Sequence, residues 1–245
     1  MNRNGRMGEK KLTLLLLPGM DGTGALFAEF VKLLPSWIEP LVVSYPRDQR
    51  LSYDQLLSIP ESALPSNKPF VILAESFSTP LAVRFAAKAP EGLQALVLCA
   101  GFVSPPRRHV VRRVALMLAP VLFTFGLPES VCRCLLAGNA APTSLVGAVC
   151  AAVSSVSSGV LAHRLRSVLT CDVQRELRSV SVPLLYLSGL EDRLVRKLSF
   201  EEIKETKTDV VLACVEAPHL ILQAKPHEAV DIFLRFLRQV RSQSD

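Results

Sequence analysis

This chain has a serine, an aspartate and a histidine that each follow a short apolar segment. Together these residue types can perform nucleophilic catalysis. Ser76 comes directly after the apolar run 70–74 and Glu75, and helix-forming sequence follows it. A serine at such a strand-to-helix turn has a strained backbone and presents its hydroxyl to solvent. Ala74 and Ser78, two positions away on either side, are small enough for a strand and a helix to cross closely there. Ser76 is therefore the candidate nucleophile.

A serine hydroxyl needs a base to remove its proton, and that base needs an acid to orient it. The chain has four histidines. One of them, His219, follows the last apolar segment, where a loop at the carboxyl edge of a sheet would carry it. Asp192 follows the preceding apolar segment and is the candidate acid, with Glu191 and Asp209 as competitors. The order along the chain is then serine, acid, histidine.

Negative charge that develops on a substrate oxygen needs two backbone N–H groups near the nucleophile. One would come from Phe77, the residue after the serine. The other would come from residues 18–24, here called the glycine loop, with Met20 as the candidate donor, because glycines let the backbone approach closely. Asp21 is expected to shape this loop by hydrogen bonds to its own backbone. The spacing G-x-x-G-x-G, with no following Lys-Ser/Thr, does not favour a nucleotide-binding site.

Short apolar runs alternate with amphipathic segments, which predicts βα units around a mostly parallel sheet. The runs show no polar alternation, so we expect strands that are covered on both faces. The predicted strands are 12–17, 41–45, 70–75, 95–100, 183–188 and 210–215. The predicted helices between them are 25–34, 53–63, 77–88, 194–206 and 227–240. The sequence thus predicts an α/β fold with about six strands flanked by helices.

About eighty residues separate the fourth predicted strand from the fifth, and they read as helical over 108–122, 129–137, 143–153 and 159–168. An insertion here would lie over the carboxyl ends of the strands, where ligands bind in open α/β sheets. We therefore predict a helical cap over residues 103–180 and a core made of residues 1–102 and 181–245. The uncharged segment 144–162 has the length of a membrane helix, but its serines and small residues favour a helix packed on the core.

The net charge of +6 lies entirely in the segment 103–180, which holds nine arginines and three acidic residues. Such arginines usually form the solvated face of helices. Arg107, Arg108, Arg112 and Arg113 stand beside apolar residues, so this face could meet an acidic carrier protein, a CoA group or an anionic membrane surface. The neutral remainder and the single tryptophan argue against nucleic acid as a partner.

Six cysteines are scattered along the chain without a C-x-x-C pair. This pattern is typical of reduced thiols in a cytoplasmic protein and predicts neither a disulfide framework nor a metal site. The apolar run after Lys10 and Lys11 leads into the glycine loop and not into a signal-peptide cleavage site, so we predict a buried strand there. We expect a cytoplasmic location.

With these residues the chain resembles the α/β-hydrolase superfamily over nearly its whole length. Size, cap position and the run 172–192 are similar to small serine carboxylesterases, among them the pimeloyl-acyl-carrier-protein methyl ester esterases. The glycine loop also resembles the hydrolase half of plant acyltransferases that make phytyl esters. Two features depart from the family pattern: the turn at Ser76 reads A-E-S-F-S where G-x-S-x-G is usual, and Pro18-Gly19 stands where His-Gly is common.

The resemblance implies hydrolysis of a small-molecule or carrier-linked acyl ester without a cofactor or metal. Ser76 would attack, His219 would move the proton, Asp192 would orient the histidine, and the Met20 and Phe77 amides would hold the oxyanion. A thioesterase or acyltransferase for acyl-CoA or acyl-carrier substrates could use the same residues. A non-catalytic binding protein that retains the fold is a further alternative. A serine at this turn argues against dehalogenase or epoxide hydrolase chemistry, which uses a carboxylate there.

Overall fold

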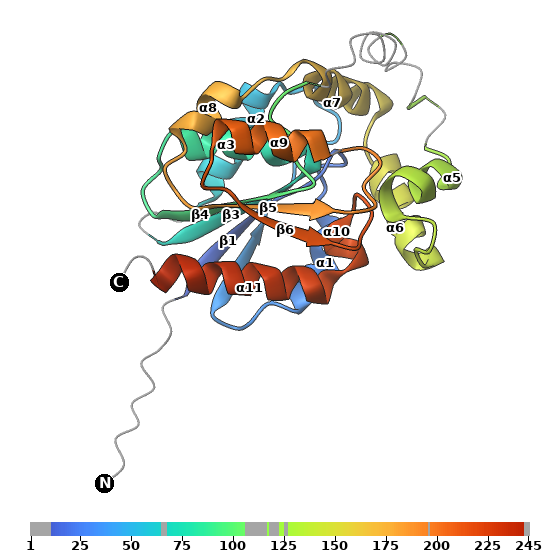
Figure 1. The fold of residues 1–245 in the computed structure, drawn as a ribbon. Helices are drawn as coiled ribbons and strands as arrows, with labels where there is room; N and C mark the ends of the chain where they lie inside the picture. The colour runs from blue at the N-terminus through green and yellow to red at the C-terminus, as the bar shows by residue number, and fades with distance from the viewer. Residues whose placement is uncertain are drawn as a thin grey trace.

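Six strands in the described part of the chain form one sheet, and each runs parallel to its neighbours (Figure 1). The computed structural model describes residues 11–64, 68–105, 117, 123–124, 127–195 and 197–242. The strands are β1 (Leu12–Leu17), β2 (Ile38–Val42), β3 (Phe70–Glu75), β4 (Leu93–Cys99), β5 (Leu184–Gly189) and β6 (Val211–Val215), in the order β2-β1-β3-β4-β5-β6. The predicted α/β class and parallel sheet are confirmed.

Helices cover both faces of this sheet (Figure 1). One face carries α2 (Tyr53–Ala63), α3 (Thr79–Ala87), α8 (Gln174–Ser179) and α9 (Lys197–Thr206). The opposite face carries α1 (Ala28–Lys32), α10 (Ile221–Ala224) and α11 (Pro226–Ser242), and the short turn η1 (Ala25–Phe27) leads into α1. The remaining helices are α5 (Glu129–Val131), the π-helix η3 (Cys132–Ala137), α6 (Thr143–Ser154) and α7 (Ser158–Thr170).

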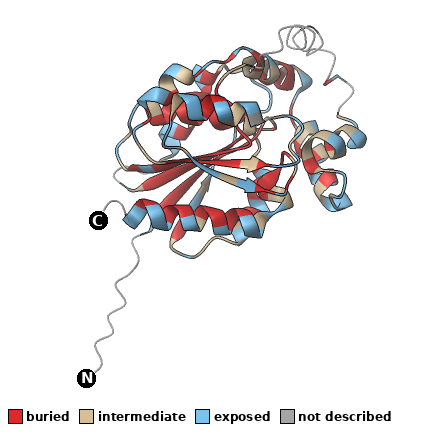
Figure 2. Ribbon diagram, in the orientation of Figure 1, coloured by how far each residue is buried: buried red, intermediate tan, exposed pale blue. Residues whose placement is uncertain are grey.

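The central strands are buried on both faces, as their unbroken apolar sequences predict. Successive side chains of a strand point to opposite faces, so Leu15 and Leu17 pack under α2 and α3 while Leu14 and Leu16 pack under α1 and α11. Figure 2 shows most of the sheet, and parts of the helices on both of its faces, coloured as buried. The edge strand β6 is more exposed, with Val211 and Leu212 each 41% accessible.

The segment between β4 and β5 contains α5, η3, α6, α7 and α8. Figure 1 shows α5 and α6 beyond the carboxyl ends of the strands, whereas α8 packs against α3 and α9. A separate cap domain with bounds 103–180 stays a prediction, and most of the predicted helix 108–122 lies outside the described residues. No single helix among the described residues is long and apolar enough to span a membrane; α6 and α7 pass that test only as a pair, which is bent by 97°.

Some predicted element bounds are wrong. The second strand ends at Val42 and not at Tyr45, because the Tyr45 N–H turns to the Gly22 carbonyl oxygen of the glycine loop (2.7 Å). The helix expected from residue 194 is described only from Lys197, and before it the N–H groups of Leu194 and Val195 bind the Asp192 side chain. The short helices α8 and α10 were not predicted.

The buried face of α11 supplies much of the core below the sheet. Phe233 on this face is 1% exposed and contacts Phe30, with ring centroids 6.3 Å apart. Replacing Phe233 by Ala removes this contact and leaves a cavity, which we expect to lower the free energy of unfolding by about 3–5 kcal/mol. Urea denaturation measures the change. The matched variant Arg235→Ala on the exposed side of α11 should alter stability by less than about 0.5 kcal/mol; equal losses would contradict the packing.

Candidate active site

Ser76 stands at the end of β3, where the chain turns into the short helix η2 (Ser76–Ser78) and then α3. Its φ is 48°, in the left-handed region that non-glycine residues seldom adopt. Such a conformation persists only where the surroundings hold it. Here the Thr79 hydroxyl donates to the Ser76 carbonyl oxygen (2.8 Å), and the Tyr53 hydroxyl donates to the Phe77 carbonyl oxygen (2.7 Å). The turn is thus clamped on both sides of the serine.

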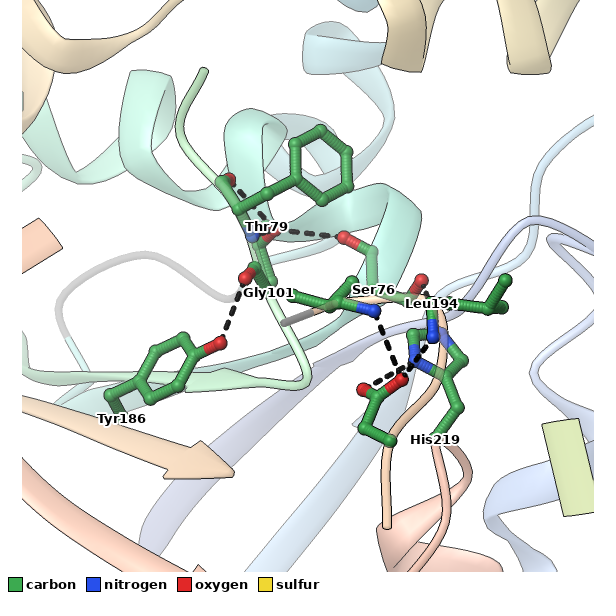
Figure 3. Close-up of polar contacts among 9 residues, drawn as sticks. Ser76, Thr79, Gly101, Tyr186, Leu194 and His219 are labelled. Atoms are coloured by element: carbon green, nitrogen blue, oxygen red, sulfur yellow. Dashed lines mark hydrogen bonds and ion pairs between the residues drawn. The ribbon is translucent and has the colours of Figure 1, made fainter. Parts of the chain in front are cut away.

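Three side chains from separate loops meet at this turn (Figure 3). The Ser76 Oγ lies 2.8 Å from His219 Nε2, and His219 Nδ1 lies 2.8 Å from Asp192 Oδ2. His219 comes from the loop after β6 and is 3% exposed, and Asp192 comes from the loop after β5. An ionised carboxylate only accepts hydrogen bonds, so the ring proton sits on Nδ1 and the Nε2 lone pair faces the serine hydroxyl.

The Asp192 carboxylate is itself held in place. Its Oδ1 accepts hydrogen bonds from the N–H groups of Leu194 (2.8 Å) and Val195 (3.0 Å), which leaves Oδ2 directed at His219. The competing acids lie elsewhere: Glu191 is exposed, and Asp209 pairs with Lys207 at 3.0 Å. Of the three candidate acids, the structure places Asp192 against the histidine.

The glycine loop lies beside the turn at Ser76. The Ser78 hydroxyl donates to the Pro18 carbonyl oxygen, and the Tyr45 hydroxyl lies 2.7 Å from the Ser78 Oγ. Within the loop the Asp21 carboxylate accepts the N–H of Thr23 (2.9 Å), so Asp21 shapes the backbone. Donation by the Met20 and Phe77 N–H groups to a substrate oxygen stays a prediction.

A second set of residues, which the sequence did not single out, supports the turn from behind (Figure 3). The Thr79 hydroxyl accepts the N–H of Phe102 (3.1 Å), and the Tyr186 hydroxyl donates to the Gly101 carbonyl oxygen (2.9 Å). A Cβ at Gly101 would lie 2.5 Å from Thr79 Cγ2, so only glycine lets the loop after β4 approach α3 this closely. A glycine directly after the fourth apolar run was the one sequence signal for this contact.

Glu75 is a buried acid next to the serine. It is 1% exposed; its Oε2 accepts one hydrogen bond from Gln223 Nε2 (3.3 Å), and its Oε1 has no partner. Burial raises the pKa of Glu75 to about 7, against the smaller lowering effect of His219 nearby. A buried carboxylic acid with this pKa titrates close to neutral pH, beside the histidine that would move the proton.

The described residues contain no group of three or more His, Cys, Asp or Glu side chains that could hold a metal ion. The six cysteines are free thiols, and the nearest approach between two of them is 3.1 Å, from Cys150 Sγ to Cys132 Sγ.

Solved structures share this architecture. A thermophilic esterase from Thermogutta terrifontis is 18% identical, with 94% of this chain and 91% of that chain covered and a TM-score of 0.79. A bromoperoxidase from Bacillus anthracis is 14% identical, with coverage of 93% and 92% and a TM-score of 0.79. A carboxylesterase structure from Nitrososphaera gargenis is 17% identical, with coverage of 96% and 93% and a TM-score of 0.77. The chain has the α/β-hydrolase fold.

No protein-family model and no curated protein matches the chain. The similarity to the α/β-hydrolase fold is thus one of architecture at 14–18% identity for these three structures. In this fold a nucleophile follows a central strand, and the acid and histidine follow later strands. Ser76, Asp192 and His219 occupy these three places in the same order.

The raised pKa of Glu75 predicts a pH-dependent stability. Its folded-state pKa of about 7 exceeds the ordinary value of 4.5, so the folded protein holds this proton more tightly than the unfolded chain does. The stability contribution is complete below pH 4.5 and is lost as the pH rises through 7. Relative to Glu75→Gln, which stays neutral, the wild type should lose about 3 kcal/mol of unfolding free energy between these limits.

Chemical denaturation over this pH range measures the difference. Glu91→Gln is the control, because Glu91 is an exposed acid just before β4, near the amino end of β3, and this variant should show no such pH dependence relative to the wild type. Parallel curves for wild type and Glu75→Gln would contradict the raised pKa.

Proposed function

We propose that this protein is a serine hydrolase that cleaves carboxylic esters through an acyl-enzyme. The observation that carries the proposal is the continuous hydrogen-bond chain from Asp192 through His219 to Ser76. A serine, a histidine and a carboxylate at these distances activate the hydroxyl for attack on a carbonyl carbon. The esterase and carboxylesterase named above share the fold, which supports an ester as substrate.

The reaction follows from the geometry. The Ser76 Oγ attacks the ester carbonyl carbon while its proton passes to His219 Nε2, 2.8 Å away. Asp192 accepts a hydrogen bond from His219 Nδ1–H and stabilises the imidazolium that forms. The proton on Nε2 then goes to the leaving alcohol as the C–O bond breaks. A water molecule gives a proton to the same nitrogen and attacks the acyl carbon; the bond from that carbon to Ser76 Oγ then breaks, and Nε2 returns the proton to Oγ as the acid leaves.

The carbonyl oxygen becomes negatively charged in each tetrahedral intermediate. We assign its stabilisation to the N–H groups of Met20 in the glycine loop and of Phe77 after the nucleophile. Phe77 is buried and held through its carbonyl oxygen by Tyr53, and the glycine loop is joined to the turn by the Ser78 hydroxyl. Both donors therefore belong to backbone that is fixed before substrate arrives.

A thioesterase or acyltransferase would use the same acyl-enzyme with a different leaving group or acceptor. From the sequence we also propose that the substrate is a small-molecule or carrier-linked acyl ester and that the location is cytoplasmic. We further propose that the arginine-rich segment contacts an acidic carrier protein or an anionic membrane. Arg107, Arg108, Arg112 and Arg113, which carry the partner proposal, lie outside the described residues.

Replacing Ser76 by Ala removes the nucleophile and should lower kcat for p-nitrophenyl esters by roughly 10⁴-fold or more. The fold should persist, because the positive φ at this position is held by neighbouring side chains. Hydrolysis assays and labelling by a fluorophosphonate probe measure the effect; the wild type should react with the probe and the variant should not. A folded wild-type protein without turnover or labelling would instead support a non-catalytic binding protein.

Comparing turnover of p-nitrophenyl esters with turnover of the matching acyl-CoA thioesters separates an esterase from a thioesterase. The acyl chains in both series should run from acetyl to palmitoyl. Adding a primary alcohol and measuring transfer products by mass spectrometry tests acyltransfer. Each assay uses Ser76→Ala as its blank, so only serine-dependent turnover is counted.

The assignment of Asp192 gives an independent test. Asp192→Asn keeps the shape of the side chain but no longer favours the proton on His219 Nδ1, so kcat should fall by about 10⁴-fold. The neighbouring variant Glu191→Gln removes an exposed carboxylate and should change kcat less than about threefold, because a surface charge contributes little. If Glu191→Gln were the damaging change, the assignment of the acid would be wrong.

A further inference from the structure

Arg164 on α7 is an arginine with an unusual environment. It is 2% exposed, whereas Arg166, Arg175 and Arg178 in the same segment are exposed. The expectation that arginines of this segment face solvent is thus wrong for Arg164. A charged group is rarely buried unless its donors are satisfied, because transfer of a charge out of water is costly. The hydrogen-bond partners of Arg164 therefore indicate its role in the structure.

The Arg164 guanidinium donates three hydrogen bonds, and each ends on a backbone carbonyl oxygen. Its Nη1 binds the oxygens of Met20 (2.9 Å) and Asp21 (2.8 Å), and its Nη2 binds the oxygen of Pro46 (2.9 Å). Hydrogen bonds from a charged donor are stronger than neutral ones. Because they end on main-chain oxygens, they fix the conformation of the glycine loop and of the chain after β2.

These contacts determine the direction of the peptide planes in the glycine loop. In a trans peptide the carbonyl of one residue and the N–H of the next point opposite ways. Holding the Asp21 carbonyl therefore aims the N–H of Gly22, which donates to the Gly19 carbonyl oxygen (3.0 Å). Holding the Gly19 carbonyl in turn aims the N–H of Met20. A chain of contacts thus runs from Arg164 to the proposed oxyanion donor.

Arg164 also contacts the other half of the proposed oxyanion hole. Its guanidinium carbon lies 5.8 Å from the centre of the Phe77 ring and 5.6 Å from the centre of the Tyr45 ring. A cation over an aromatic face is attracted by the ring electrons. Phe77, whose N–H is the second proposed donor, therefore packs against Arg164, the same side chain that holds the loop of Met20.

Gly22 leaves the room that this arrangement requires. A Cβ at Gly22 would lie 2.5 Å from Arg164 Nη1, and the φ of Gly22 is +68°. Both the close approach and the left-handed backbone exclude a side chain at this position without rearrangement. Arg164 and Gly22 thus fit each other across two segments far apart in the sequence.

We infer that Arg164 is a positioning residue for the oxyanion hole. Helix α7 brings the Arg164 side chain to the glycine loop and to Phe77. Arg164 touches neither the nucleophile nor the histidine in this structure, and its effect passes through backbone carbonyls. The inference rests on the proposed function, because an oxyanion hole has meaning only for acyl chemistry. It also means that the segment between β4 and β5 completes the site.

Arg164→Gln, Arg164→Lys and the control Arg166→Gln test this role. Losing one oxyanion donor typically lowers kcat by about 10²–10³-fold, so we expect Arg164→Gln to lower kcat at least ~10-fold with KM changed less than ~3-fold. Arg164→Lys keeps the charge but not the fork of donors and should be intermediate. Arg166→Gln changes an exposed arginine on the same helix and should match the wild type.

Amide hydrogen exchange supplies a readout that does not depend on activity. Without the guanidinium the N–H groups of residues 19–22 should exchange at least ~10-fold faster in Arg164→Gln, while those of β3 stay protected. If Arg164→Gln does not fold, Gly22→Ala displaces the guanidinium from the loop side and should give the same loss of kcat. In the double variant the two losses should not add, because both act through one contact.

Two results would overturn the inference. One is an Arg164→Gln variant whose kcat and loop exchange equal those of Arg166→Gln. The other is a rise in KM at unchanged kcat, which would make Arg164 a substrate-binding residue. If instead the wild type shows no Ser76-dependent hydrolysis, the proposed function fails, and the exchange experiment still decides whether Arg164 holds the loop.

Discussion

The hydrogen bond between His219 and Ser76 depends on one constraint: parallel strands end at the same edge of a sheet. β3, β5 and β6 each deliver one loop to that edge, and β3 and β5 are separated only by β4. A serine and a histidine that are 143 positions apart in sequence thereby come within 2.8 Å. The buried apolar strands provide the rigid base, so the loops can hold polar groups at fixed distances.

The same edge holds several polar groups that are removed from water, and each needs a partner. His219 has one on either ring nitrogen, and Arg164 has three carbonyl oxygens. Glu75 has one oxygen unpaired and a pKa raised to about 7, and the Oε1 of its partner Gln223 is unpaired as well. A buried acid that is half protonated near neutral pH lowers the stability of the fold and changes the field around the histidine. Strain and unpaired groups of this kind gather at functional sites.

The candidate site and the helices nearest to it come from different parts of the chain. In the proposed mechanism the nucleophile, base and acid come from loops after β3, β5 and β6, and the segment between β4 and β5 adds supporting contacts from Gly101, Phe102 and Arg164. Whether water or another acceptor then takes the acyl group depends on which molecule reaches the acyl-enzyme. Helices α5 and α6 lie beyond the carboxyl ends of the strands, at the same edge of the sheet as the candidate site (Figure 1).

Much of the fold could be predicted from the sequence because its signals are local. The unbroken apolar runs of β1 and β3 mark buried strands with their correct bounds, and Ser52 before α2 forms a capping box with Gln55 that fixes the helix start. The early end of β2 could not be predicted. There the Tyr45 N–H turns to the Gly22 carbonyl oxygen, which belongs to a loop whose position depends on the tertiary fold.

The sequence by itself determined which chemical groups are available and the order in which they follow the strands, because both are read along the chain. Only the tertiary structure decided that Asp192 and not its neighbour Glu191 faces the histidine, since adjacent residues in a loop point in different directions. It also turned Arg164 inward, onto carbonyls 144 and 143 positions away. Composition cannot distinguish that arginine from its solvent-facing neighbours, because burial of a charge depends on partners that only folding brings together.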